Sequence, residues 1–182
     1  MKNIIFVFQL FIVSCGYYSL AGSIPPHIKS ISIPLVENQT SEFSISEDLT
    51  DVITQYFNSS GILLVQNEGE AHSTLKCTIN KITDGPYSYN KNESISEYRY
   101  KVDVKIEWYD NTKEKNIIDK NYSGFGAYGL SGDISSDGID NDNDGKIDSE
   151  DDSEFGEPRS FAAKVAINKV AEDVLNDILT TW

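Results

Sequence analysis

Two stretches of the chain have the apolar spacing of an amphipathic helix. From Ile45 to Phe57, apolar residues recur at i, i+4, i+7, i+8, i+11 and i+12, so they share one side of a helix. Ser44 and Glu47 fit a capping box before this run, and Gly61 fits the position just past its end. We therefore predict a helix over 44–60.

The second helical stretch is residues 158–182, with a proline near its first turn. Its apolar face is predicted to consist of Phe161, Val165, Ile167, Val170, Val174, Leu175 and Ile178.

Other stretches alternate apolar and polar residues, as half-buried strands do. The alternation is clearest over 97–110, where one face is aromatic or aliphatic and the other holds Arg99, Lys101, Asp103, Lys105 and Glu107. Residues 27–38 predict another strand, in which Pro34 indicates an edge or an end. Further strands are predicted at 62–66, short and buried, at about 72–82, and at 115–129, where the strand ends among glycines. Residues 83–94 read as a turn or loop.

The predicted element order is β-α-β-β-β-β-α, and 182 residues suit one domain. An antiparallel-rich sheet needs one face covered, and two amphipathic helices can cover it. We expect an α+β fold, a two-layer sandwich with a mixed or antiparallel sheet of four to five strands.

The N-terminus has the composition of an export signal. Lys2 precedes an apolar run from Ile4 to Val13, which is too short to span a membrane. The run ends in Val13-Ser14-Cys15, the pattern of a bacterial lipobox, although a chance apolar segment ending in Ser-Cys would look the same. We predict a signal peptide at 1–14, lipidation at Cys15 and a tether over 15–27. Gly16 rather than Asp after the cysteine resembles lipoproteins of the outer membrane, so we expect a lipid-anchored protein facing the periplasm.

The cysteine count excludes an intramolecular disulfide. Lipid on Cys15 leaves Cys77 alone, on the apolar face of a predicted strand with Leu75 and Ile79. No catalytic motif surrounds Cys77, so we expect a buried, unreactive thiol.

Charge is concentrated in one segment. The formal net charge is −14, and residues 133–157 contribute −10 of it, with eleven acids and one lysine. The remainder is mildly acidic and offers no basic face for phosphates, which excludes general nucleic-acid binding.

The acidic segment contains a candidate cation site. Its residues fit D-x-D-x-D-G-x-x-D-x-x-D, and alternating carboxylates around a glycine turn can converge on one ion. The candidate ligands are Asp140, Asp142, Asp144, Asp148 and Asp151. The flanks are not helical and position twelve is not Glu, so the loop resembles thrombospondin type-3 repeats rather than an EF-hand. We expect weak Ca²⁺ binding, with a solvated acidic loop as the alternative.

The lipidated end is similar to a known family. Residues 15–40 read CGYYSLAGSIPPHIKSISIPLVENQT, in which Cys-Gly-Tyr, Pro-Pro-His-Ile-Lys and Ile-Pro-x-x-x-Asn-x-Thr resemble the LptE family of lipopolysaccharide-assembly lipoproteins. The resemblance covers 15–127 and 158–182, so the acidic segment reads as an insertion that the function does not require.

The resemblance implies a non-enzymatic protein. LptE-like lipoproteins partner and plug the outer-membrane β-barrel LptD and help lipopolysaccharide reach the cell surface. Lipopolysaccharide phosphates attract cations, so the candidate contacts are Lys76, Arg99, Lys101 and Lys105, with a solvated, self-paired sheet face as the alternative.

Two other function classes compete. A calcium-dependent envelope lipoprotein with an unrelated binding role would lose function when 133–157 is deleted, whereas an LptE-like protein would not. An envelope enzyme would need positioned partners for His27 or His72, and the sequence shows no Ser, Cys or acid beside either.

Overall fold

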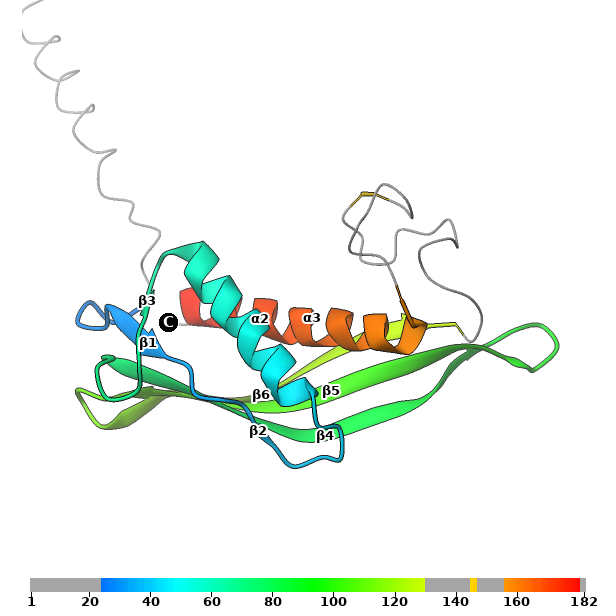
Figure 1. Cartoon of the computed structure of the whole chain (residues 1–182), viewed down its shortest axis with the longest axis horizontal. Helices are drawn as coiled ribbons and strands as arrows, with labels where there is room; N and C mark the ends of the chain where they lie inside the picture. The colour runs from blue at the N-terminus through cyan, green and yellow to red at the C-terminus, as the bar shows by residue number, and fades with distance from the viewer. Residues whose placement is uncertain (1–23, 130–144, 147–155, 181–182) are drawn as a thin grey trace, which may run out of the picture.

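The computed structural model describes residues 24–129, 145–146 and 156–180 (Figure 1). The predicted signal peptide, Cys15 and all five candidate calcium ligands lie outside these residues. The described elements are β1 (Ser30–Ser32), β2 (Glu37–Asn38), α2 (Ile45–Ser60), β3 (Leu64–Val65), β4 (Ser73–Tyr89), β5 (Ile95–Asp110), β6 (Lys115–Tyr128) and α3 (Pro158–Thr180).

The α+β two-layer prediction is confirmed. The described sheet is mixed, in the order β3-β1-β4-β5-β6, with β2 also pairing with β4. Strands β1, β2 and β3 pair in parallel, whereas β4, β5 and β6 form an antiparallel meander. Helices α2 and α3 cross over the same face of this sheet, and the end of the β4–β5 hairpin extends beyond them (Figure 1). No described helix has the length and hydropathy that crossing a membrane requires.

The core lies between the helices and β5. The alternation predicted for β5 is confirmed, because every second residue from Tyr100 to Trp108 is fully buried. Helix α2 adds Leu49, Ile53 and Phe57 to this core. Helix α3 adds Ile167, Val170, Val174 and Ile178, together with three alanines that the predicted face omitted, Ala162, Ala166 and Ala171. Val165 and Leu175 are only half-buried, so the buried face of α3 is narrower than predicted and has smaller side chains.

The first predicted strand is two short strands. After β1 the chain turns away at Ile33 and Pro34 and then pairs with β4 again as β2. The proline therefore marks a strand end, as predicted, but β1 is not an edge, because it lies between β3 and β4. Ser30 and Ser32 are buried, and their hydroxyls are satisfied: Ser32 Oγ donates to Thr74 Oγ1, and Ser30 Oγ bonds to His72 Nδ1.

The loop predicted over 83–94 is wrong. Strand β4 continues through Gly85 and Pro86 to Tyr89, because β5 pairs with it along this whole length. A register shift after Pro86 accommodates the proline. The turn covers only 90–94, where Asn90 Oδ1 accepts from the backbone amides of Asn92 and Ser94.

Helix α2 begins and ends as predicted but is not capped as predicted. Ser44 makes no side-chain cap hydrogen bond, so the Ser44–Glu47 capping box is wrong. Gly61 has φ +62°, and its amide donates to the Phe57 carbonyl, which confirms the predicted C-terminal glycine. Strand β3 is short, as predicted, but it is not buried, because Leu64 is exposed and Val65 is half-buried; the buried residue of this segment is Leu63, just before the strand.

Candidate functional site

The predicted basic residues share the face of the sheet that the helices leave open. Lys76 of β4 pairs directly with Glu107 of β5, and directly paired residues point to the same side. Arg99, Lys101 and Lys105 occupy that same side of β5, opposite the buried residues. All four therefore lie on one surface; alternation along β5 predicted this for Arg99, Lys101 and Lys105, and the β4–β5 register adds Lys76.

Two of these bases are held by carboxylates of the same face. Lys101 Nζ lies 2.7 Å from Asp103 Oδ1. Lys105 Nζ lies 3.1 Å from Glu107 Oε1 and 3.4 Å from Asp119 Oδ1, and the hydrogen bond with Glu107 raises the pKa of Lys105. These ion pairs match the self-paired alternative for that part of the face.

Arg99 has a different environment. Its guanidinium carbon lies 4.8 Å from the centre of the Tyr87 ring and 5.4 Å from that of Phe125. The two rings are themselves in contact, with centres 6.3 Å apart, and about half of each is exposed. Among the described residues, no carboxylate forms an ion pair with Arg99. The three side chains, here called the Arg99 cluster, combine an unneutralised cation with two exposed aromatic surfaces.

The Arg99 cluster suits an anion carried on a larger ring-bearing molecule. A planar guanidinium can donate two parallel hydrogen bonds to a phosphate or carboxylate. The aromatic rings hold it in place by cation–π contact and offer flat apolar area to the rest of the ligand. Sequence reasoning missed both rings, because Tyr87 fell in a predicted loop and Phe125 in a strand expected to end among glycines.

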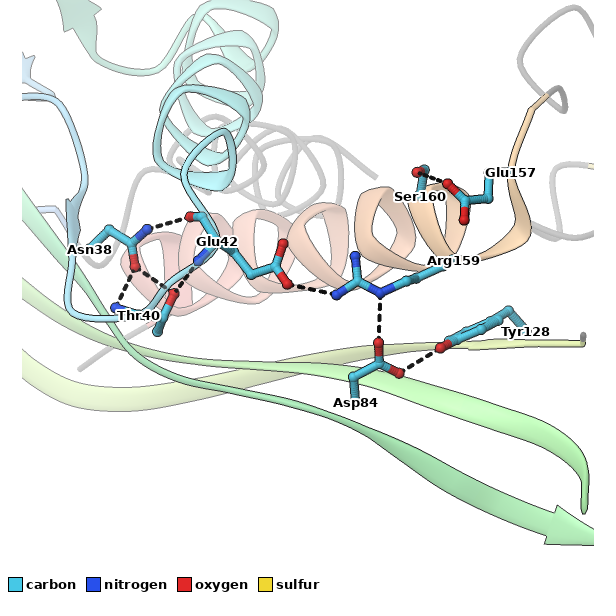
Figure 2. Close-up of polar contacts among 8 residues, drawn as sticks. All are labelled: Asn38, Thr40, Glu42, Asp84, Tyr128, Glu157, Arg159 and Ser160. Carbon is cyan, nitrogen blue, oxygen red and sulfur yellow. Dashed lines mark hydrogen bonds and ion pairs between the residues drawn. The ribbon is translucent and has the colours of Figure 1, made fainter.

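A second polar cluster lies on the helix side of the sheet (Figure 2). Arg159 in the first turn of α3 bonds to Asp84 of β4 and to Glu42 before α2, each at 2.6 Å, and lies 5.0 Å from the centre of the Tyr100 ring. Tyr128 donates to the other Asp84 oxygen at 2.6 Å, and burial together with this bond raises its pKa to about 12. Because Arg159 already holds two carboxylates, this cluster joins α3, β4 and the loop before α2 rather than offering a ligand site.

A family model described as "LptE: Lipopolysaccharide-assembly" matches residues 28–181, most of the chain. The chain belongs to the LptE family. The family that residues 15–40 suggested is thereby confirmed, by a match that begins at residue 28 and runs through both helices and the whole sheet. No curated protein sequence matches the chain.

Solved structures show the same fold at low identity. Protein XCC0632 from Xanthomonas campestris has a TM-score of 0.53 and 8% identity, covering 86% of this chain and 90% of its own. The hypothetical protein CT253 from Chlamydia trachomatis has a TM-score of 0.52 and 11% identity, covering 85% and 99%. A putative lipoprotein from Caulobacter crescentus has a TM-score of 0.50 and 9% identity, covering 84% and 89%. At such low sequence identity, these structural matches show a shared fold and nothing further.

LptE proteins are non-enzymatic, and the two histidines here belong to structural pairs. His27 Nε2 lies 2.6 Å from Asp110 Oδ2, and His72 Nδ1 lies 2.9 Å from Ser30 Oγ. The expectation that neither histidine has an acid or serine partner is therefore wrong. Asp110 and Ser30 are these partners, and each comes from a segment far away in the sequence. The two pairs are separate, and Ser30 and Asp110 are buried. They attach the start of the domain to the ends of β4 and β5.

Cys77 is buried, as predicted for a structural thiol. Only 3% of it is exposed, and burial raises its pKa to about 12, so the thiolate needed for reaction is disfavoured.

The five candidate calcium ligands lie outside the described residues, whereas Gly145 between them lies within. Gly145 has φ +95°, a conformation suited to the sharp turn that the spacing requires. In the described part of the chain, no three acidic, His or Cys side chains are grouped to hold a metal.

Proposed function

We propose that this LptE-family chain is an outer-membrane lipoprotein that partners and plugs an LptD-type β-barrel during lipopolysaccharide assembly. The observation that carries the proposal is the family match over 28–181. Lipid on Cys15, the first residue of the predicted tether over 15–27, would anchor the protein facing the periplasm.

Lipopolysaccharide contact is proposed for the open face, with Arg99 as its principal cation. Lys101 and Lys105 are engaged with carboxylates, so a phosphate would have to displace those partners. Arg99 has no such competitor among the described residues, and Tyr87 and Phe125 give it a fixed position. Lys76 is exposed and remains an additional candidate further along the same face.

The test is binding of purified lipopolysaccharide to Arg99→Gln. Loss of one bidentate, charge-assisted contact is expected to weaken binding about tenfold. Lys91→Gln, in the exposed turn of the same hairpin, removes the same charge and is the matched control, with an expected change below about twofold. Normal binding by a variant with Arg99, Lys101 and Lys105 all neutralised would contradict the proposal.

We also propose weak Ca²⁺ binding by the five aspartates of the insertion, on the strength of their spacing and of the turn at Gly145. The ion would brace the insertion locally, and lipopolysaccharide assembly would not require it. A calcium-dependent lipoprotein with an unrelated role is the competing function, and it makes the opposite prediction for chelation.

A further inference from the structure

The edge of the sheet formed by β3 carries a cleft remote from the Arg99 cluster. The cleft has a volume of about 550 Å³ and lies between the segment after β1, strand β3 with the turn that follows it, and Thr54 of α2. Its apolar walls come from Ile33, Pro34, Leu64 and Val65. Strand β3, which contributes Leu64 and Val65 to the cleft, has β1 as its one neighbour in the described sheet, so its other edge has no strand partner there.

Large apolar side chains are exposed around this cleft. Leu64 inside it is 64% exposed, Leu35 next to Pro34 is 63% exposed, and Ile62 just before β3 is 43% exposed. The neighbouring Leu63 is 3% exposed and supplies the core contact of this segment. The fold therefore does not need leucine at position 64, and a cluster of exposed aliphatic residues marks an interaction surface.

The chain segment between Lys29 and Lys76, which forms the cleft, carries only negative formal charges. No Lys or Arg occurs between Lys29 and Lys76, whereas this stretch contains seven acids. Glu42 is bound by Arg159. The other six are exposed and form no ion pair with any described residue: Glu37, Glu47, Asp48, Asp51, Glu68 and Glu70.

Two acids line the cleft, and two more lie on the side of α2 that holds Thr54. Glu68 and Glu70 line it directly. On α2, Glu47 and Asp51 precede Thr54 by seven and three residues and so share its side of the helix. On the open face of the sheet, by contrast, acids and lysines neutralise each other.

We propose that this cleft is a docking site for an extended, basic and apolar polypeptide segment of a partner protein. Aliphatic side chains of the segment would pack on Ile33, Pro34 and Leu64, and Lys or Arg residues between them would meet Glu68 and Glu70. An extended segment fits because an edge strand offers main-chain hydrogen bonds to a new strand. The acidic rim repels phosphates, which excludes an anionic lipid headgroup here.

The test uses the full lipidated chain in phosphatidylcholine nanodiscs, which carry no net charge, with empty nanodiscs as the blank. The probe is a fluorescent synthetic peptide in which valine and lysine alternate, and binding is measured by anisotropy. Two further peptides replace all lysines by glutamate or all valines by serine. The valine–lysine peptide is expected to bind, and both substituted peptides are expected to bind at least about tenfold more weakly.

Variants of exposed residues locate the binding. Glu68→Gln with Glu70→Gln is expected to weaken binding about tenfold, and Leu64→Ser is expected to weaken it severalfold. The control is Glu93→Gln with Glu114→Gln, which removes two exposed carboxylates elsewhere and should change binding less than about twofold. Thermal unfolding of each variant verifies that the fold is intact.

If the Glu68/Glu70 variant and the Glu93/Glu114 variant weaken peptide binding equally, the peptide is attracted by net charge alone, and the proposal is overturned. Unchanged affinity in Leu64→Ser, or equal binding of the serine–lysine peptide, would also overturn it, because the apolar walls would then take no part.

Discussion

At the scale of single residues, Asp110 is the one charged side chain that is fully buried in the described parts of the chain. Burial alone would raise its pKa, but hydrogen bonds from Thr112, His27 and the backbone amides of Thr112 and Lys113 outweigh it. The pKa of Asp110 is therefore held well below the ordinary 3.8. A carboxyl whose pKa falls on folding stabilises the fold above its unfolded pKa and loses this contribution as pH falls.

Replacing Asp110 by Asn should lower the free energy of unfolding at neutral pH by about 1–3 kcal/mol, because the charged acceptor is lost. Between pH 6 and pH 2.5, the wild type should lose stability more steeply than Asp110→Asn. Urea denaturation at several pH values measures both effects. Glu114→Gln, an exposed carboxyl in the following turn, serves as control and should follow the wild type. Parallel pH curves for Asp110→Asn and wild type would contradict the assignment.

Single residues of the candidate site were only partly predictable. The period of two on β5 was sufficient to assign Arg99, Lys101 and Lys105 to one face, because alternation is a local property of a strand. The aromatic partners of Arg99 lie on β4 and β6, and contact between strands depends on register, which the sequence of one strand does not contain.

At the scale of elements, two glycines set how closely α3 lies on β6. A Cβ on Gly124 would come within 2.0 Å of the Ala166 carbonyl oxygen, and one on Gly126 within 2.3 Å of the Ala162 carbonyl oxygen. The helix backbone thus lies directly on the strand, and the buried alanines of α3 match the glycines of β6. These glycines allow close packing rather than ending the strand.

Gly124→Ala should therefore destabilise the protein by about 3 kcal/mol, since backbone must move to admit one methyl group. Gly85→Ala is the matched control within the same sheet, because a Cβ there has no neighbour within 4 Å. Its effect should be below about 0.5 kcal/mol. Urea denaturation measures both changes, and equal stability of Gly124→Ala and wild type would show that the helix can lift off the strand without cost.

Element types were predictable wherever periodicity was strong. The 3.6-residue period identified α2 and α3, and Gly61 marked the end of α2. The far half of β4 was missed because Gly85 and Pro86 are local turn signals, and the long pairing with β5 overrides them. The burial of Ser30 and Ser32 could not be read from the local alternation, because their hydrogen-bond partners lie about forty residues away in β4 and just before it.

At the scale of the whole molecule, the residues on either side of the insertion are joined by side-chain bonds to one residue of the sheet. Tyr128 ends β6, Arg159 is in the first turn of α3, and both bond to Asp84 (Figure 2). The two ends of the acidic segment are thereby joined through β4, whatever the segment between them does. Sequence could identify this segment as an insertion, but not the Asp84 link that joins its ends.

Excision of 133–156 should therefore leave the fold intact. Glu157 is retained because its carbonyl accepts the Phe161 amide at the start of α3. The excised variant should show the circular dichroism spectrum of the wild type and unfold cooperatively at a similar temperature. Loss of cooperative unfolding would mean that the insertion contributes to the core after all.

The central claim is tested most directly by a pull-down of the tagged, lipidated protein from outer membranes in mild detergent, with mass spectrometry of the proteins recovered. Wild type and the 133–156 excision variant are compared, each with and without a calcium chelator. We expect one large β-barrel of the LptD type in all four samples. Absence of such a barrel, or its loss on chelation or excision, would contradict the proposed function and place the function in the acidic insertion.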